Sequence, residues 1–196
     1  MQIPWLNSIR QTHKLTIFAA QNAAALAPIL GTAITRFNAL SQSLSLNVTY
    51  EISSTAPDPD NLNGANVQLA LANGAYTFKG LGADGNGFLA ADARKGVTRF
   101  VTGGSSQDAK LVKAFIFLPA NIQVHDFMKI CMTVHEMLHA TGLDNDEHSS
   151  DADPDIFCSS LTPSGQGVQC GLFANRVMPP IWMTLRTAAK IQPLWS

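Results

Sequence analysis

The chain has 196 residues, 46 % of them hydrophobic, which predicts a single domain, residues 1–196, with one substantial core. Charged residues make up only 14 %, and 13 basic against 14 acidic side chains leave a net charge of -1. Because nucleic acids and anionic membranes attract basic surfaces, this balance argues against both as partners.

The most apolar stretch, residues 17–34, is interrupted by Gln21, Asn22, Pro28 and Gly31. A membrane span needs about 20 predominantly apolar residues. We therefore expect no transmembrane helix and interpret this stretch as part of the fold.

The first predicted elements are a strand at 12–19, rich in apolar and β-branched residues, and an amphipathic helix within 22–41. Pro28 removes a helical hydrogen bond, so this helix should begin late or kink there. Alternating apolar residues then predict two half-buried strands, at 46–52 and 67–71.

Six of the fourteen glycines fall within residues 73–96, and this density predicts a long mobile loop. Two more strands are expected at 97–102 and 113–118, the second so continuously apolar that it should be an inner strand. A helix should run over 126–141, capped by its first residue and ended by Gly142.

Residues 143–171 are polar and rich in turns, and a last helix is expected at about 180–190. This order of elements predicts an α/β (α+β) fold in three layers, with a mixed sheet and the 126–141 helix across it.

Chemistry concentrates at the end of that helix, where residues 135–139 read His-Glu-Met-Leu-His. Two histidines four residues apart lie about 40° apart and about 6 Å along one helical face, so both imidazoles can reach one metal ion. Glu136 points to the side, where it can touch a metal-bound water without being a ligand. With this composition the pattern is expected only about 0.002 times by chance.

A catalytic zinc site needs a third protein ligand and one open position. No Asp, Glu or His follows Asp155, so the last helix cannot supply that ligand. His125 lies on the same helix as the pair but about 15 Å away along the axis. The third ligand should therefore come from residues 143–155.

The run HEMLHATGLDNDEH resembles the metzincin clan of zinc endopeptidases, whose motif is H-E-x-x-H-x-x-G-x-x-H or Asp. His135, Glu136, His139 and Gly142 match that motif. Its third-ligand position is occupied by Asn145, which is a poor zinc ligand.

His148, three residues beyond the expected position, suits a loop lengthened by an insertion, and we favour it as the third ligand; Asp146 and Asp144 stay open as alternatives. The resemblance also implies a methionine turn below the metal. Met178 is the favoured candidate for this turn, and an ordinary core residue is the alternative interpretation.

The resemblance implies a zinc endopeptidase with a mixed twisted sheet, an active-site helix and a small C-terminal subdomain. The cleft should lie between an upper subdomain of about residues 1–142 and a lower one of about 143–196. Glu136 would act as general base, taking a proton from the zinc-bound water and passing it to the departing amine. A protein or peptide substrate would lie extended along strand 97–102, with residues 73–96 at the rim.

Two other functions stay open: a non-catalytic protein whose metal only fastens the helix to the following loop, and a metal-dependent hydrolase of a non-peptide bond. Alternating Asp151, Asp153 and Asp155 leave Ca²⁺ open as a further ion. Cys158 and Cys170 could pair in a disulfide, which favours secretion or delivery outside the producing cell. We favour a monomer.

Overall fold

A computed structural model describes residues 2–93, 95–104, 108–121, 124–149, 155–158 and 182–196. Five strands form one sheet in the order β2-β1-β3-β7-β6, with bounds Lys14–Ala19 (β1), Thr49–Ile52 (β2), Val67–Ala72 (β3), Val97–Gly103 (β6) and Lys110–Pro119 (β7). Neighbours from β2 through β7 run parallel, whereas β6 runs antiparallel to β7. The sheet is therefore mixed, as the sequence predicts.

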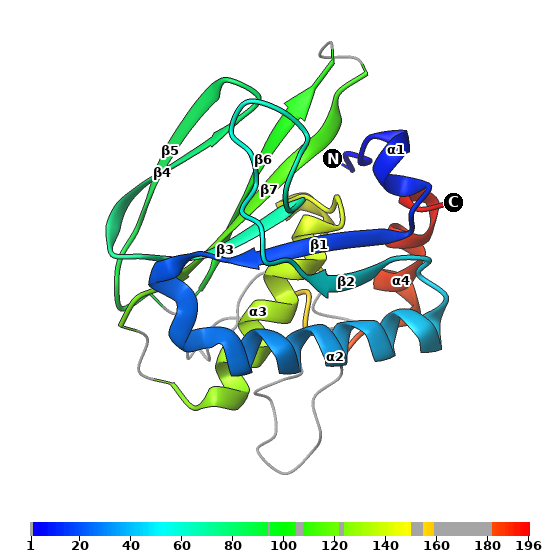
Figure 1. Ribbon diagram of the computed structural model, residues 1–196. Helices are drawn as coiled ribbons and strands as arrows, with labels where there is room; N and C mark the ends of the chain where they lie inside the picture. The colour runs from blue at the N-terminus through cyan, green and yellow to red at the C-terminus, as the bar shows by residue number, and fades with distance from the viewer. Residues whose placement is uncertain (1, 94, 105–107, 122–123, 150–154, 159–181) are drawn as a thin grey trace.

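Two long helices, α2 (Ala27–Leu44) and α3 (Asp126–Ala140), pack on one face of this sheet (Figure 1). The shorter helices are α1 (Asn7–Arg10), η1 (Gln21–Leu26), η2 (Asn145–Glu147), α4 (Leu185–Ile191) and η3 (Gln192–Leu194). The α/β prediction is confirmed. The division into upper and lower subdomains at about residue 142 stays a prediction.

Strand β7 is buried on both faces, which explains its continuous apolar run. Ala114, Ile116 and Leu118 join the core under the helices. Phe115 and Phe117 point to the opposite face, because successive strand residues alternate. As predicted, β7 is an inner strand, between β3 and β6.

The prediction of a mobile loop at 73–96 is wrong. Most of this segment is an antiparallel hairpin of two strands, β4 (Gly74–Gly80) and β5 (Ala83–Leu89). The hairpin packs over the second face of the sheet. The glycines of one strand leave space for aromatic rings of the other strand. Gly87 pairs with Tyr76 and Gly85 with Phe78, and an added Cβ would lie 2.3 Å from the Tyr76 hydroxyl or 2.2 Å from the Phe78 ring. Cross-strand aromatic packing, not mobility, accounts for this composition.

Helix α2 begins late, with Pro28 in its first turn, where a missing N–H costs nothing. By length and composition the segment Gln21–Leu44 is long and apolar enough to cross a membrane, which differs from the prediction of no transmembrane helix. In this fold one stripe of α2, including Ile29, Leu30 and Phe37, is buried. Leu30 and Phe37 belong to the main core, which also holds residues of the sheet and α3.

Three buried aromatic side chains bind the C-terminal end of α3. The indole N–H groups of Trp5 and Trp195 donate to the carbonyls of Ala140 (2.8 Å) and Thr141 (3.1 Å), and the Tyr50 hydroxyl donates to the Met137 carbonyl (2.8 Å). The last carbonyls of a helix have no partner within it. Segments far apart in sequence therefore fix the end of α3.

At the other end of α3, His125 is the cap residue and makes no side-chain cap bond, so the expectation that Asp126 caps the helix is wrong. The last helix begins at Leu185, later than predicted, and Thr184 caps it.

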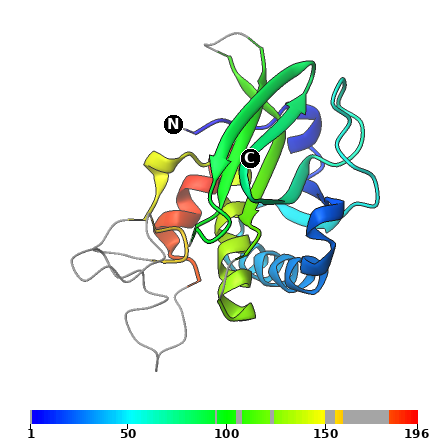
Figure 2. The same cartoon turned by 90° about the vertical axis from the view of Figure 1, so that its left-hand side faces the viewer.

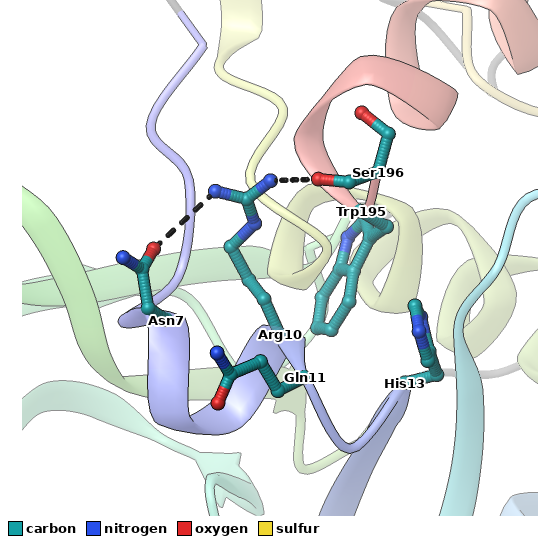
Figure 3. A pocket seen from close by; sticks show the side chains of 6 residues that line it. All are labelled: Asn7, Arg10, Gln11, His13, Trp195 and Ser196. Atoms are coloured by element: carbon teal, nitrogen blue, oxygen red, sulfur yellow. Dashed lines mark hydrogen bonds between the residues drawn. The ribbon is translucent and has the colours of Figure 1, made fainter.

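The C-terminal end of the chain lies beside α1. The guanidinium of Arg10 donates to the carbonyl of Ser196 and reaches the Asn7 side chain at 3.5 Å (Figure 3). Arg10, His13 and Trp195 line one pocket there. The Arg10 contact thus joins α1 to the last residue of the chain, next to Trp195.

Candidate metal centre

The structure brings together the three histidines predicted to bind metal. One ring nitrogen from each of His135, His139 and His148 lies within 4.8 Å of the others. The Nε2 atom of His148 is 3.3 Å from that of His135 and 3.1 Å from that of His139. Three imidazole nitrogens therefore converge on one point.

The outer nitrogens of two rings fix the protonation of the inner ones. His135 Nδ1 lies 2.8 Å from the Ile156 carbonyl, and His139 Nδ1 lies 2.9 Å from the Leu143 carbonyl. A carbonyl only accepts, so each Nδ1 carries the proton and each Nε2 presents its lone pair. His148 can donate one proton to only one of them, and a cation would satisfy all three.

The spacing also suits a metal. Ligand nitrogens at the usual zinc distance stand about 3.3–3.4 Å apart in a tetrahedron. Burial lowers the pKa of all three imidazoles, that of His139 to about 4. Neutral imidazole is the form that binds metal, so the residues present fit a divalent ion.

A tight turn after α3 carries the third histidine back. Gly142 has φ 117°, and a Cβ there would lie 2.5 Å from the Ile3 carbonyl. The Asp144 carboxylate accepts from the Asn145 N–H and caps the 3-10 turn η2, directly after which His148 follows. This turn brings His148 back to the two histidines of the helix.

The other residues considered for the third position do not join the group. Asp144 and Asp146 are both described, and neither has a donor atom within the histidine cluster, whereas Asn145 lines the adjoining cavity. Asp144 is close enough for its charge to raise the pKa of His139 and His148 against the effect of burial. His125, as expected, also lies outside the cluster.

Helix α4 lies beside the loop that carries His148 (Figure 2). The Lys190 ammonium donates to the carbonyl of Glu147 and, at 3.4 Å, to that of His148. It also lies 3.7 Å from the Glu147 carboxylate. Helix α4 therefore contributes no metal-binding side chain, but its Lys190 holds the loop that carries His148.

Sequence reasoning missed the segment beneath the histidines. Phe157 packs against all three imidazoles, with ring centroids 5.3, 4.7 and 4.9 Å from those of His135, His139 and His148. Its N–H donates to the Asp155 carboxylate (2.9 Å), which also accepts from the N–H and hydroxyl of Thr184. Asp155 thus ties this segment to α4.

Glu136 lies beside the cluster, buried at 4 % exposure. The Thr98 hydroxyl on β6 donates to its carboxylate at 2.7 Å. Burial raises the pKa of Glu136 to about 7, while the Thr98 hydrogen bond and the charge of Lys95 oppose that rise. One carboxyl oxygen is thereby fixed in place.

The second carboxyl oxygen has room only because residue 96 is glycine. A Cβ on Gly96 would lie 2.7 Å from both Cγ and Oε1 of Glu136. We expect Gly96→Ala to push the carboxyl off Thr98 and to lower the free energy of unfolding by about 1–3 kcal/mol.

Gly31→Ala is the matched control, because Gly31 lies inside α2 with nothing within 4 Å of its Cβ position. It should raise the free energy of unfolding by about 0.5–1 kcal/mol. Urea unfolding measures the free energy of unfolding of both glycine variants. Equal changes in that free energy would contradict the proposed crowding at Glu136.

A cavity of about 520 Å³ opens onto this group. His135, His139, His148 and Glu136 line one part, and residues 95–99, at the start of β6, line another. The cluster therefore faces space for a ligand on one side and protein on the other.

Several sequence expectations lie outside the described residues: the methionine turn at Met178, and Asp151 and Asp153 of the calcium alternative. Asp155, the third residue of that alternative, is instead hydrogen-bonded to Phe157 and Thr184. Cys158 is disulfide-bonded, although Cys170 lies outside the described part. Cys131 is free and buried, and burial raises its pKa to about 12.

Comparison with models of known families and with curated protein sequences finds no match for the chain. Support for a site therefore comes from the geometry itself. A mixed α/β protein brings together three buried or half-buried histidines that could bind a metal ion.

Proposed function

We propose that this protein is a zinc-dependent endopeptidase of the metzincin type. One observation carries the proposal: three histidine nitrogens converge at a cavity that also contains the buried carboxyl of Glu136. Three imidazoles suit zinc, and a divalent ion bound by them acidifies a water molecule and polarises a carbonyl group.

Glu136 has the position of a general base. It is not one of the three converging donors, it lines the same cavity, and the Thr98 hydroxyl orients its carboxyl group. From there it would accept a proton from the attacking water and later deliver it to the departing amine.

Strand β6 offers a place for an extended substrate. Among the described strands it pairs with β7 alone and forms an edge of the sheet, beside the cavity. An extended peptide can add to such an edge through backbone hydrogen bonds. Protein or peptide is therefore the substrate class we propose.

A purely structural metal site fits less well. Structural zinc sites are closed by four protein ligands, whereas catalytic sites keep one position open. Within the described residues three side chains converge, and the cavity lies against them. The disulfide at Cys158 supports our further proposal that the protein acts outside the producing cell.

Metal removal tests the proposal. The purified protein should contain one zinc per chain and hydrolyse unfolded casein. Dialysis against a chelator should abolish hydrolysis, and added zinc should restore it. Elemental analysis and peptide mass spectrometry are the measurements. Zinc-loaded protein that cleaves no peptide in a broad mixture would contradict the peptidase proposal and favour a non-peptide substrate.

Thr98→Val should lower kcat for peptide hydrolysis by about tenfold with little change in KM, because it removes one hydrogen bond that orients Glu136. Thr98→Ser keeps the hydroxyl and should retain most of the rate. Zinc content should be the same in both variants. If serine were as slow as valine, the hydroxyl would have no orienting role.

A further inference from the structure

The rim of the cavity near Glu136 is cationic. Lys95 and Arg99 both line the cavity and both are exposed. Among the described residues that line it, Glu136 is the only carboxylate, and it is buried. A ligand entering from solvent therefore meets two positive side chains.

The guanidinium of Arg99 is held in place without an anion. Arg99 alternates with Thr98, so it points away from Glu136 and toward the hairpin, where its Nε donates to the Tyr76 hydroxyl at 2.9 Å. The Tyr76 ring is itself stacked on Phe117, with centroids 4.0 Å apart. This anchor leaves both terminal nitrogens for a ligand.

Neither cation is neutralised within the described part of the chain. The salt bridges there join other pairs, and neither Lys95 nor Arg99 takes part in one. Arginine presents its terminal N–H groups in a fork that matches a carboxylate. The rim thus has the chemistry of a carboxylate-binding subsite.

The residues that line the cavity from the loop after α3 add no negative charge to offset the two cations at the rim. Asn145 lines the cavity with a neutral amide. Its acidic neighbours Asp144, Asp146 and Glu147 are not among the residues that line the cavity. Asp144 caps the 3-10 turn, and Glu147 pairs with Lys190. Among the described residues, positive charge therefore predominates at the exposed rim of the cavity.

We infer that Arg99, assisted by Lys95, selects peptide substrates with an aspartate or glutamate side chain close to the cleaved bond. This inference rests on the proposed peptidase function and names the substrate class for it. A peptide lying along β6 would pass beside Arg99, and its side chains would alternate toward and away from the rim.

Two measurements on the zinc-loaded protein test the inference. The first is cleavage of a mixed peptide library, with product ends sequenced by mass spectrometry. The second is binding of fluorescein-labelled hexapeptide pairs that differ only in Glu against Gln, measured with Glu136→Gln to prevent turnover.

We expect cleavage sites enriched in acidic residues and tighter binding of the Glu peptides. The Glu-over-Gln preference should fall about threefold in Arg99→Gln and about tenfold in the double variant with Lys95→Gln. Lys110→Gln is the matched control, since Lys110 pairs opposite Gly103 at the far end of β6 and does not line the cavity. It should keep the full preference.

The possible outcomes distinguish the acidic-substrate inference from the peptidase proposal. Cleavage without an acidic preference, or a preference that Arg99→Gln leaves intact, overturns the inference and leaves the peptidase proposal standing. Preferential binding of Glu peptides without cleavage of any peptide overturns the peptidase proposal, while the carboxylate-binding subsite stands. Equal binding of both peptides overturns the subsite.

Discussion

Replacing Glu136 with glutamine should lower kcat for peptide hydrolysis by at least about 100-fold, and by as much as about 10⁴-fold. The substitution keeps the size of the side chain and the oxygen that accepts from Thr98 (2.7 Å), so the cavity should keep its shape. It removes the ability to accept and return a proton. Zinc content should be unchanged, because Glu136 is not among the converging donors.

Glu51→Gln makes the same chemical change at an exposed side chain on β2, whose only described ion pair is with Lys14. It should leave kcat and zinc content at the wild-type values. Hydrolysis by Glu136→Gln at more than a tenth of the wild-type rate would remove Glu136 from the role of general base. Loss of zinc in that variant would instead place the carboxyl among the metal ligands.

The helical part of the site could be predicted because its geometry is local. His135 and His139 share a face through helix periodicity, and Gly142 ends the helix where a Cβ would meet the Ile3 carbonyl. Elimination leaves residues 143–155 for the third ligand, and the resemblance to the metzincin motif favours His148 there, with Asp146 and Asp144 as alternatives. A single 3-10 turn, Asn145–Glu147, precedes His148 and returns the chain to the helix.

The supporting parts of the site depend on contacts between distant residues. Phe157 under the histidines, and Lys190 behind the loop, carry no periodic or spacing signal in the sequence. Thr98 reaches Glu136 only because β6 lies at the sheet edge beside α3. Burial and tertiary packing decide these positions, and composition does not encode them.

The hairpin shows how composition alone can mislead. Glycine density in 73–96 predicts a mobile loop, yet Gly85 and Gly87 lie opposite Phe78 and Tyr76, whose rings cover them. The alternation of aromatic residues at 76 and 78 was the signal that could have found the strand. The hairpin also matters for the cavity, because the Tyr76 hydroxyl accepts a hydrogen bond from Arg99 Nε.

His148→Ala should weaken zinc binding by more than about 100-fold, since even residues that only support metal ligands cost about 10–100-fold when removed. His148 provides one of three converging nitrogens, and it comes from a loop that can lose its ring without unfolding α3. Competition with a chromophoric chelator at neutral pH measures the affinity, and casein hydrolysis should fall with zinc occupancy.

His125→Ala is the matched control, because His125 is exposed at the opposite end of α3 and lies outside the cluster. Asp144→Asn and Asp146→Asn test the alternative ligands. Asp144→Asn keeps a side-chain oxygen that can still cap the 3-10 turn, so both variants should bind zinc within about tenfold of wild type. If either aspartate variant lost zinc while His148→Ala kept it, the third ligand would be a carboxylate, and the three-imidazole arrangement would not be the metal site.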